Sequence, residues 1–336
     1  MPGALSTFQM RSARTIALGL GGVALLVLSG CVGPNGNVAP VAAISALPQE
    51  GYAPLSVVLD GSDTRDPDGD ALIYEWTFGD GETAIGATVV HEFDEGTYEV
   101  TLTVTDTRGA VGTATTTIIS AAVPDGFIVL RYEWVHDGED QVWDALLPYN
   151  LCQMYRARIR TPLAEQYDYP AYVLDPLDDP TLEDLAADLW NRAGGDADAF
   201  VDLVLSFVQA GINYTADPPS AEWPLYPLET LYDKAGDCED TSILFVSLLR
   251  AKGLASRLAT VDTDADGFPD HILAFVPISP EDVAGLTCSS GQSPTVLEIE
   301  GELYALAETA CATGTLDLGC DPWGLQADDV DTSWAF

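Results

Sequence analysis

The sequence predicts a multidomain chain in which an all-β sandwich is followed by a domain that combines helices and strands. Between residues 39 and 121, apolar and polar side chains alternate with a period of two in short runs separated by Gly- and Asp-rich turns, a pattern typical of half-buried strands. Beyond Pro124, apolar residues recur at helical spacing. The chain has 336 residues, of which 47% are apolar, and this is enough for two or three domains with proper cores.

The first 30 residues have the features of a secretory signal peptide. Arg11 and Arg14 precede an apolar run from Ile16 to Leu28, which is too short for a comfortable membrane span. The run ends in Leu-Ser-Gly followed by Cys31, which resembles the lipobox of bacterial lipoproteins. The resemblance implies that Cys31 becomes the lipidated first residue of the mature protein, whereas the alternative is an ordinary cleaved signal peptide. We therefore expect a membrane-anchored lipoprotein of the cell envelope that faces the periplasm or the exterior.

Removal of this peptide would leave a strongly acidic chain. The whole sequence has 13 basic and 53 acidic residues, and cleavage removes two arginines and no acids, which gives a formal charge of −42. Such a surface cannot neutralise phosphates, which argues against nucleic acid as a partner. Self-repulsion of this size needs screening, so the composition suggests an environment rich in salt or divalent cations.

Residues 39–121 carry the strand pattern most clearly. From Tyr98 to Thr105, apolar residues alternate with Glu and Thr, and together with the neighbouring runs they predict a small β-sandwich. A series of motifs in this segment resembles the PKD family of extracellular immunoglobulin-like modules. These motifs are Ala53-Pro54-Leu55, Asp60-Gly61-Ser62, Asp66-Pro67-Asp68-Gly69-Asp70, Trp76-Thr77-Phe78-Gly79-Asp80-Gly81 and Gly96-Thr97-Tyr98. The resemblance implies an immunoglobulin-like spacer, or a module that contacts surface polymers or glycans, without chemistry of its own. Trp76 is expected in its core.

Two amphipathic helices are expected early in the second domain. Thr181 is a candidate N-cap, and a stripe of Leu and Trp side chains follows until Gly194 ends the helix. A second helix holds an apolar stripe from Phe200 to Val208 and ends near Gly211. A Pro-rich stretch then leads to the candidate site.

The functional prediction centres on Gly-Asp-Cys-Glu-Asp-Thr at positions 236–241. Asp237 fits an N-cap and Asp240 the third helical position, so Cys238 should open a largely apolar helix that Gly253 terminates. A thiol in the first turn faces unpaired backbone N–H groups and the positive end of the helix dipole, which favour thiolate over thiol. Cys238 is thus predicted to be a free nucleophile with a low pKa. The alternative is a structural or disulfide-bonded cysteine.

A candidate base lies downstream of this helix. Residues 256–261 and 272–276 are predicted strands, and His271 stands at the start of the second one. A histidine there could lie against the helix N-terminus and act as a general base. The other two histidines are weaker candidates, because His91 falls in the β-module and His136 in a polar turn.

Together with the segment from Tyr226 to Leu231, these residues resemble the transglutaminase-like superfamily, in particular its bacterial and archaeal thiol peptidases. The resemblance extends from about Tyr132 to Gly324. It implies a papain-like α+β core, in which a central helix bearing the cysteine packs on an antiparallel sheet bearing the histidine and an acid. Carried over to this chain, Cys238 is the nucleophile and His271 the base.

The acid of this implied triad is less clearly marked. Family members place an Asp or Glu on the strand after the histidine, often before a threonine, and Glu308 matches that arrangement best. The interval from His271 to Glu308 is longer than usual, however, so Asp282 and Glu298 stay open as alternatives.

These features predict an exported, membrane-anchored cysteine enzyme that cleaves or transfers an amide bond of a protein or peptide at the cell surface, through a thioester at Cys238. Hydrolysis is favoured over cross-linking, because no feature of the sequence is dedicated to an acceptor lysine. The alternative is a catalytically silent adhesion or binding lipoprotein. The expected segments are a signal peptide (1–30), a lipidated tether (31–38), the PKD-like sandwich (39–121) and the transglutaminase-like domain (122–336).

The remaining cysteines suit disulfides. With Cys31 assigned to lipid and Cys238 to chemistry, four of the six cysteines are left, an even number expected in an oxidising compartment. Cys311 with Cys320 is the simplest pair to predict, which leaves Cys152 with Cys288.

An acidic loop directly precedes His271. Asp262, Asp264, Asp266 and Asp270 alternate with other residues around a Gly, and such spacing can turn several oxygens toward a hard cation. The loop resembles the short Asp-x-Asp-x-Asp-Gly calcium loops of extracellular proteins. We therefore predict a structural or regulatory Ca²⁺ bound by these four acids and the Phe268 carbonyl, whereas the alternative is a solvated acidic turn.

Overall fold

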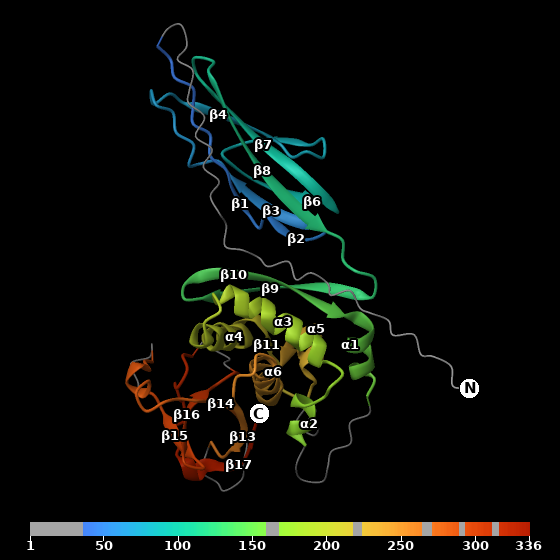
Figure 1. Cartoon of the computed structure of the whole chain (residues 1–336), viewed down its shortest axis with the longest axis vertical. Helices are drawn as coiled ribbons and strands as arrows, with labels where there is room; N and C mark the ends of the chain where they lie inside the picture. The colour runs from blue at the N-terminus through green and yellow to red at the C-terminus, as the bar shows by residue number, and fades with distance from the viewer. Residues whose placement is uncertain (1–35, 159–167, 218–223, 264–270, 289–292, 311–315) are drawn as a thin grey trace, which may run out of the picture.

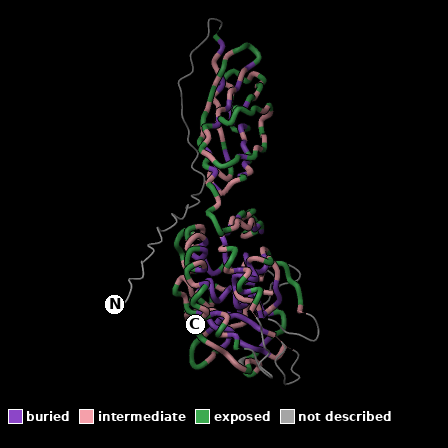
Figure 2. The backbone as a smooth tube through the Cα atoms, turned by 90° about the vertical axis from the view of Figure 1, so that its right-hand side faces the viewer, coloured by how far each residue is buried: buried purple, intermediate pink, exposed green. Residues whose placement is uncertain are grey.

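The computed structural model describes residues 36–158, 168–217, 224–263, 271–288, 293–310 and 316–336. A β-sandwich and an α+β domain follow one another along the long axis of the molecule, as Figure 1 and the rotated view in Figure 2 both show. The predicted fold class, an immunoglobulin-like sandwich followed by a papain-like α+β domain, is confirmed. No helix within the described ranges is long and apolar enough to cross a bilayer.

The sandwich consists of two sheets around one core. Its strands are β1 (Ser45–Leu47), β2 (Glu50–Tyr52), β3 (Leu55–Asp60), β4 (Leu72–Thr77), β5 (Thr83–Ile85), β6 (Thr88–Phe93), β7 (Gly96–Asp106) and β8 (Val111–Ala121). One sheet has the order β1-β3-β6 and the other β2-β8-β7-β4-β5. The alternating apolar residues of β7 point into the core, and Trp76 is fully buried there with its indole N–H bonded to the Gly86 carbonyl. Trp76 is thus a core residue, as predicted.

A long hairpin and a group of helices open the second domain. Their order is β9 (Phe127–His136), β10 (Glu139–Pro148), α1 (Tyr149–Arg156), α2 (Tyr169–Val173), α3 (Asp179–Arg192), α4 (Ala197–Gly211), β11 (Asn213–Tyr214), α5 (Pro227–Asp233), β12 (Ala235–Gly236) and α6 (Cys238–Ala251). Helix α3 starts earlier than predicted, after Asp178 instead of Thr181, because Pro180 is tolerated in the first turn, where backbone N–H groups have no helical partner. Helix α4 begins at Ala197, where the Asp196 side chain caps it by accepting the N–H groups of Asp198 and Ala199.

An antiparallel sheet completes the domain. Its strands are β13 (Arg257–Val261), β14 (His271–Pro277), β15 (Val296–Ile299), β16 (Glu302–Ala307) and β17 (Val330–Ala335), with short 3₁₀ turns at Val283–Gly285 and Ala327–Asp329. The strand order is β15-β16-β14-β13-β17. The hairpin of β15 and β16 lies between β14 and Glu308 in the chain, which accounts for the long interval between His271 and that acid.

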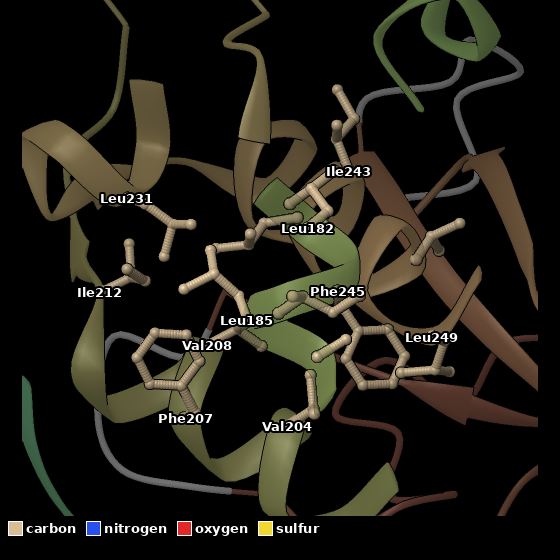
Figure 3. Packing of buried hydrophobic residues seen from close by; sticks show 14 of the residues in the cluster. Leu182, Leu185, Val204, Phe207, Val208, Ile212, Leu231, Ile243, Phe245 and Leu249 are labelled. Atoms are coloured by element: carbon tan, nitrogen blue, oxygen red, sulfur yellow. The ribbon is translucent and has the colours of Figure 1, made fainter. Parts of the chain in front are cut away.

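Helix α6 lies at the centre of the domain. Every residue from Glu239 to Leu249 is buried, and the helix contacts the helices on one side and β14 on the other. Figure 3 shows side chains of the helical core, among them Leu185, Phe207 and Phe245, packed against one another. Truncation of a buried phenylalanine such as Phe245 to alanine typically costs about 3–5 kcal/mol. The first residue of α6 is therefore held by a well-packed element.

Candidate active site

The cysteine motif forms the helix start that the sequence predicts. Asp237 is the N-cap of α6, and it forms a capping box with Asp240 in which each side chain accepts from the other's backbone. Asp240 also accepts the Leu225 N–H at 2.6 Å. A Cβ atom at Gly236 would lie 2.6 Å from the Cβ of Asp240, so glycine is required there. Cys238 consequently occupies the first turn of a buried helix.

His271 and Glu308 are brought together from neighbouring strands. His271 opens β14, Glu308 directly follows β16, and the two strands pair in the sheet. Nε2 of His271 lies 3.0 Å from Oε2 of Glu308, while the other carboxylate oxygen accepts the Ala310 N–H at 2.7 Å. A carboxylate can only accept hydrogen bonds, so this contact keeps the proton on Nε2 and the lone pair on Nδ1.

The other two candidate acids lie elsewhere in the domain. Asp282 bonds to Ser279 in a surface turn, and Glu298 is exposed on β15, the edge strand. Among the described residues, Glu308 is the one of the three that contacts His271.

Three hydroxyl groups fasten the cysteine helix to the two strands. Thr309, next to Glu308, lies 3.0 Å from the Thr241 hydroxyl and 2.8 Å from the Ser242 hydroxyl. Ser242 in turn donates to the carbonyl of Ile272, the neighbour of His271, at 3.4 Å. All three hydroxyls are buried, where such bonds are shielded from competing water. The sequence marks Thr309 merely as the residue after the acid, and its connecting role depends on the tertiary contact.

The predicted low pKa of Cys238 is wrong in direction. Burial raises the pKa of this thiol, the adjacent Glu239 carboxyl raises it further, and the backbone N–H of Ile272 lowers it. The thiol donates to Oε2 of Glu239 at 3.2 Å. The removal of water and the presence of nearby acids thus outweigh the helix dipole. The side chain is therefore a thiol in the resting protein.

The acids beside Cys238 are themselves crowded. Asp217, Asp237 and Glu239 each offer an oxygen within 4.8 Å of the others. Within the described part of the chain, Oδ1 of Asp237 and Oε1 of Glu239 are buried without a hydrogen-bond partner. Burial, followed by the effect of Asp237, raises the pKa of both Glu239 and Asp240. The acids Asp217, Asp237 and Glu239 could together hold a cation. The more exposed group of Asp66, Asp68 and Asp70 in the sandwich could do the same.

The predicted calcium loop and lipid site lie mostly outside the described residues. Asp262 is described, and its N–H donates to the Asp329 carbonyl. Asp264, Asp266, Phe268 and Asp270 fall outside, as does Cys31. The loop they belong to joins the paired residues Val261 and His271.

The predicted disulfide pairing is wrong. Cys288 bonds to Cys320, with Cα atoms 5.6 Å apart. Cys152 is instead a free, buried cysteine of α1, and burial raises the pKa of its thiol to about 11. Cys311 lies outside the described residues. Cys288 and Cys320 meet because Gly319 hydrogen-bonds to Leu306 of β16, a contact that proximity in the sequence could not indicate.

One aromatic residue of the site was not predicted. The indole of Trp323 lies over the imidazole of His271, with ring centroids 4.7 Å apart and the planes inclined by 58°. It follows the disulfide-bonded Cys320 by three residues. No sequence pattern pointed to it, because its partner is 52 residues away in the chain.

Two family models match the chain. Residues 37–120 match the PKD domain, and residues 183–280 match the transglutaminase-like superfamily. The sequence is also 47% identical over 55 residues to collagenase ColA of Clostridium perfringens, a match that covers 16% of this chain and 5% of that protein. It is 36% identical over 88 residues to a microbial collagenase of Vibrio alginolyticus, which covers 26% of this chain and 11% of that protein. The chain therefore spans a small part of these relatives.

Some solved structures resemble the PKD part of the chain, and another covers most of the chain at low sequence identity. The PKD1 domain of Vibrio anguillarum Epp is 33% identical, with a TM-score of 0.22, and the match covers 25% of this chain and 98% of that domain. A candidate cysteine protease of Cytophaga hutchinsonii is 13% identical with a TM-score of 0.27, over 80% of this chain and 73% of that one. The family models and the fold together thus place a PKD domain at residues 37–120 and, after it, a transglutaminase-like α+β domain that includes residues 183–280.

Proposed function

We propose that the protein is an exported, membrane-anchored cysteine enzyme that hydrolyses a peptide or amide bond through a thioester at Cys238. The observation that carries the proposal is the His271–Glu308 contact of 3.0 Å at the sheet against which the Cys238 helix packs. Nucleophile, base and orienting acid on separate elements are the arrangement that acyl transfer by a thiol requires.

In this mechanism His271 takes the proton of Cys238 as the sulfur attacks the substrate carbonyl. Burial and Glu239 raise the pKa of the thiol, so proton transfer accompanies attack instead of preceding it. The protonated imidazole then gives this proton to the departing amine, and a thioester remains. Water then attacks the thioester carbonyl and gives a proton to His271. As the C–S bond breaks, the imidazolium returns this proton to the sulfur, so that the carboxylic acid leaves and the thiol is restored. Glu308 holds the imidazole through Nε2 at each step.

Charge on the carbonyl oxygen needs donors that are already in place. The backbone N–H of Cys238 lies in the first turn of α6, where backbone donors have no helical partner. It can therefore stabilise the oxyanion beside the attacking sulfur.

The remaining parts of the chain support export and surface contact. The signal-like residues 1–30 and Cys31 would anchor the protein, and the PKD domain would act as a spacer or contact a surface polymer or glycan. The PKD domain and the matches to collagenases support an extracellular location. The proposal further includes Ca²⁺ at residues 262–270, which would order the loop that leads into His271.

The second candidate is a binding lipoprotein without catalysis. The raised pKa of Cys238 favours it, because a half-buried thiol beside carboxyl groups is a poor nucleophile unless a base acts on it.

Alkylation of the native protein with iodoacetamide at neutral pH, followed by peptide mass spectrometry, separates the two candidates. If the protein is an enzyme, labelling should be faster at Cys238 than at Cys152, which is buried, or at Cys288 and Cys320, which are bonded to each other. Hydrolysis of a fluorescent casein should disappear in Cys238→Ala and fall by about 10²–10⁴-fold in His271→Ala.

Glu308→Gln and Glu298→Gln form a matched pair for the acid. Glu308→Gln should lower labelling and turnover, since the amide no longer fixes the imidazole tautomer, whereas the exposed Glu298 should be dispensable. If Glu308→Gln behaves like the wild type, another residue orients His271. If Cys238 is labelled no faster in the wild type than in His271→Ala, the binding candidate is correct.

A further inference from the structure

Trp323 covers the side of His271 that would otherwise meet solvent. The two rings are 4.7 Å apart, and the imidazole side chain is 14% exposed. Trp323 as a whole remains 39% exposed, so this large aromatic residue lies at the surface with part of its side chain against the candidate catalytic base.

The backbone that carries this indole is fixed on both sides. Asp321 is buried, and its carboxylate accepts the N–H groups of Trp323, Gly324 and Leu325 at 2.8, 2.9 and 2.6 Å. Leu325 is buried in the core below the sheet. On the other side, Cys320 is bonded covalently to Cys288. The turn from Cys320 to Leu325, here called the tryptophan turn, is therefore anchored by a disulfide, a buried carboxylate and a core leucine.

The same turn is tied to the strand that carries the acid. Gly319 donates its N–H to the Leu306 carbonyl at 2.7 Å and accepts the Thr295 N–H at 2.8 Å. Leu306 lies on β16, two residues before Glu308. Strand β16 therefore positions both Glu308 and Trp323, and both residues contact the same imidazole.

We propose that Trp323, clamped by the Cys288–Cys320 disulfide, is a positioning residue for His271. The proposal rests on the proposed function, because it gives the tryptophan a role in presenting the base to Cys238. The indole restricts the rotation of the imidazole, so that Nε2 stays on Glu308 and Nδ1 stays available to the thiol. It also excludes water from the His271–Glu308 hydrogen bond, which is stronger in a low local dielectric. The imidazolium that forms during attack gains a favourable contact with the indole ring.

Alkylation of Cys238 by iodoacetamide tests this role without a known substrate. Trp323→Ala should slow alkylation by about ten- to a hundredfold, because a misplaced base of this kind costs up to about 10²-fold. Trp323→Phe should restore most of the rate, since a phenyl ring can cover the imidazole equally. Phe127→Ala is the matched control, because Phe127 is also 39% exposed but lies on β9, and it should leave the rate unchanged.

The outcomes separate this inference from the proposed function. His271→Ala defines the rate without the base. A wild-type rate equal to that of His271→Ala would contradict the proposed function itself. If the wild-type rate is well above that of His271→Ala, the positioning role alone is contradicted by either of two results. One is that Trp323→Ala reacts as fast as the wild type, and the other is that Trp323→Phe reacts no faster than Trp323→Ala. Melting temperatures within a few degrees of the wild type show that the exposed substitutions do not act through unfolding.

The clamp is tested by combining variants. Cys288→Ser with Cys320→Ser should slow alkylation of Cys238 as Trp323→Ala does, and addition of Trp323→Ala should cause little further loss, because both changes release one contact. If the combined variant loses alkylation rate by the product of the two separate reductions, the disulfide does not act through Trp323. Asp321→Ala loosens the turn while the disulfide stays intact, and its alkylation rate is measured in the same way. This variant tests the clamp even if the disulfide variant fails to fold.

Discussion

Glu239 adds to the effect of burial in raising the pKa of the neighbouring Cys238 thiol. It accepts a hydrogen bond from Cys238, and its Oε1 atom is buried without a partner within the described part of the chain. Burial, and then Asp237, raise its pKa. A neutral Glu239 is compatible with this environment, whereas an ionised one adds an uncompensated buried charge beside the thiol.

The pH dependence of stability should reveal this carboxyl group. Above the ordinary Glu pKa of 4.5, the unfolded chain loses a proton that the folded protein still holds, so this contribution to stability decreases as the pH rises. In metal-free buffer, the melting temperature of Glu239→Gln should therefore fall less than that of the wild type between about pH 5 and about pH 8. Glu298→Gln, at an exposed position, is the control. Equal slopes for Glu239→Gln and the wild type would contradict the assignment.

At the scale of elements, the site depends on how α6, β14 and β16 are joined. The Thr309 hydroxyl bonds to two residues in the first turns of α6, and Ser242 reaches the Ile272 carbonyl. The partner of His271 in β13 is Val261, directly across the acidic loop. A cation held by residues 262–270 would therefore act first on this terminal pair of the ladder.

Calcium should therefore influence both stability and the reactivity of Cys238. We expect EGTA to lower the melting temperature and the rate of alkylation by iodoacetamide, and added Ca²⁺ to restore both, because bound cation orders the loop before His271. Asp264→Asn with Asp266→Asn should abolish the response. If Glu239→Gln abolishes it instead, the cation is held by the acids around Cys238. If EGTA and Ca²⁺ have no effect in either assay, residues 262–270 are only a turn.

At the scale of the whole molecule, the two domains have separate cores. The apolar cluster of the sandwich includes Trp76, and the second domain has two clusters, one with Phe245 and one with Leu325, neither of which shares a residue with the sandwich. The chain joins them through a single segment after β8. Separate cores of this kind usually belong to units that fold on their own.

A shortened chain of residues 122–336 should therefore fold and retain the candidate chemistry. We expect Cys238 to be alkylated within about twofold of the rate in the longer protein, while retention on insoluble surface polymers should be lost with the PKD domain. The sandwich alone, residues 36–121, is the matched control for retention. Failure of residues 122–336 to show a cooperative thermal transition would contradict the predicted division between the domains.

Several features of this protein follow from short stretches of sequence. The alternation around Tyr98, the cap of Asp237 and Asp240, and the position of His271 at a strand start were predicted, and the structure has each of them. Such patterns are local, because helix caps and strand faces depend on residues a few positions apart. The family resemblance added Glu308 as the preferred acid, and its contact with His271 agrees with that choice.

Other features were decided by contacts between distant segments. Cys288 pairs with Cys320, not with Cys152, because the strands of the sheet bring residues 32 positions apart together. The pKa of Cys238 is raised because folding removes water from the thiol, an effect that the helix start alone does not reveal. Trp323 meets His271 because the disulfide and Asp321 direct the tryptophan turn toward the site. The sequence therefore determined which residues are candidates for the site, whereas the tertiary structure decided their protonation, their cross-links and their neighbours, since these depend on distance and burial in space.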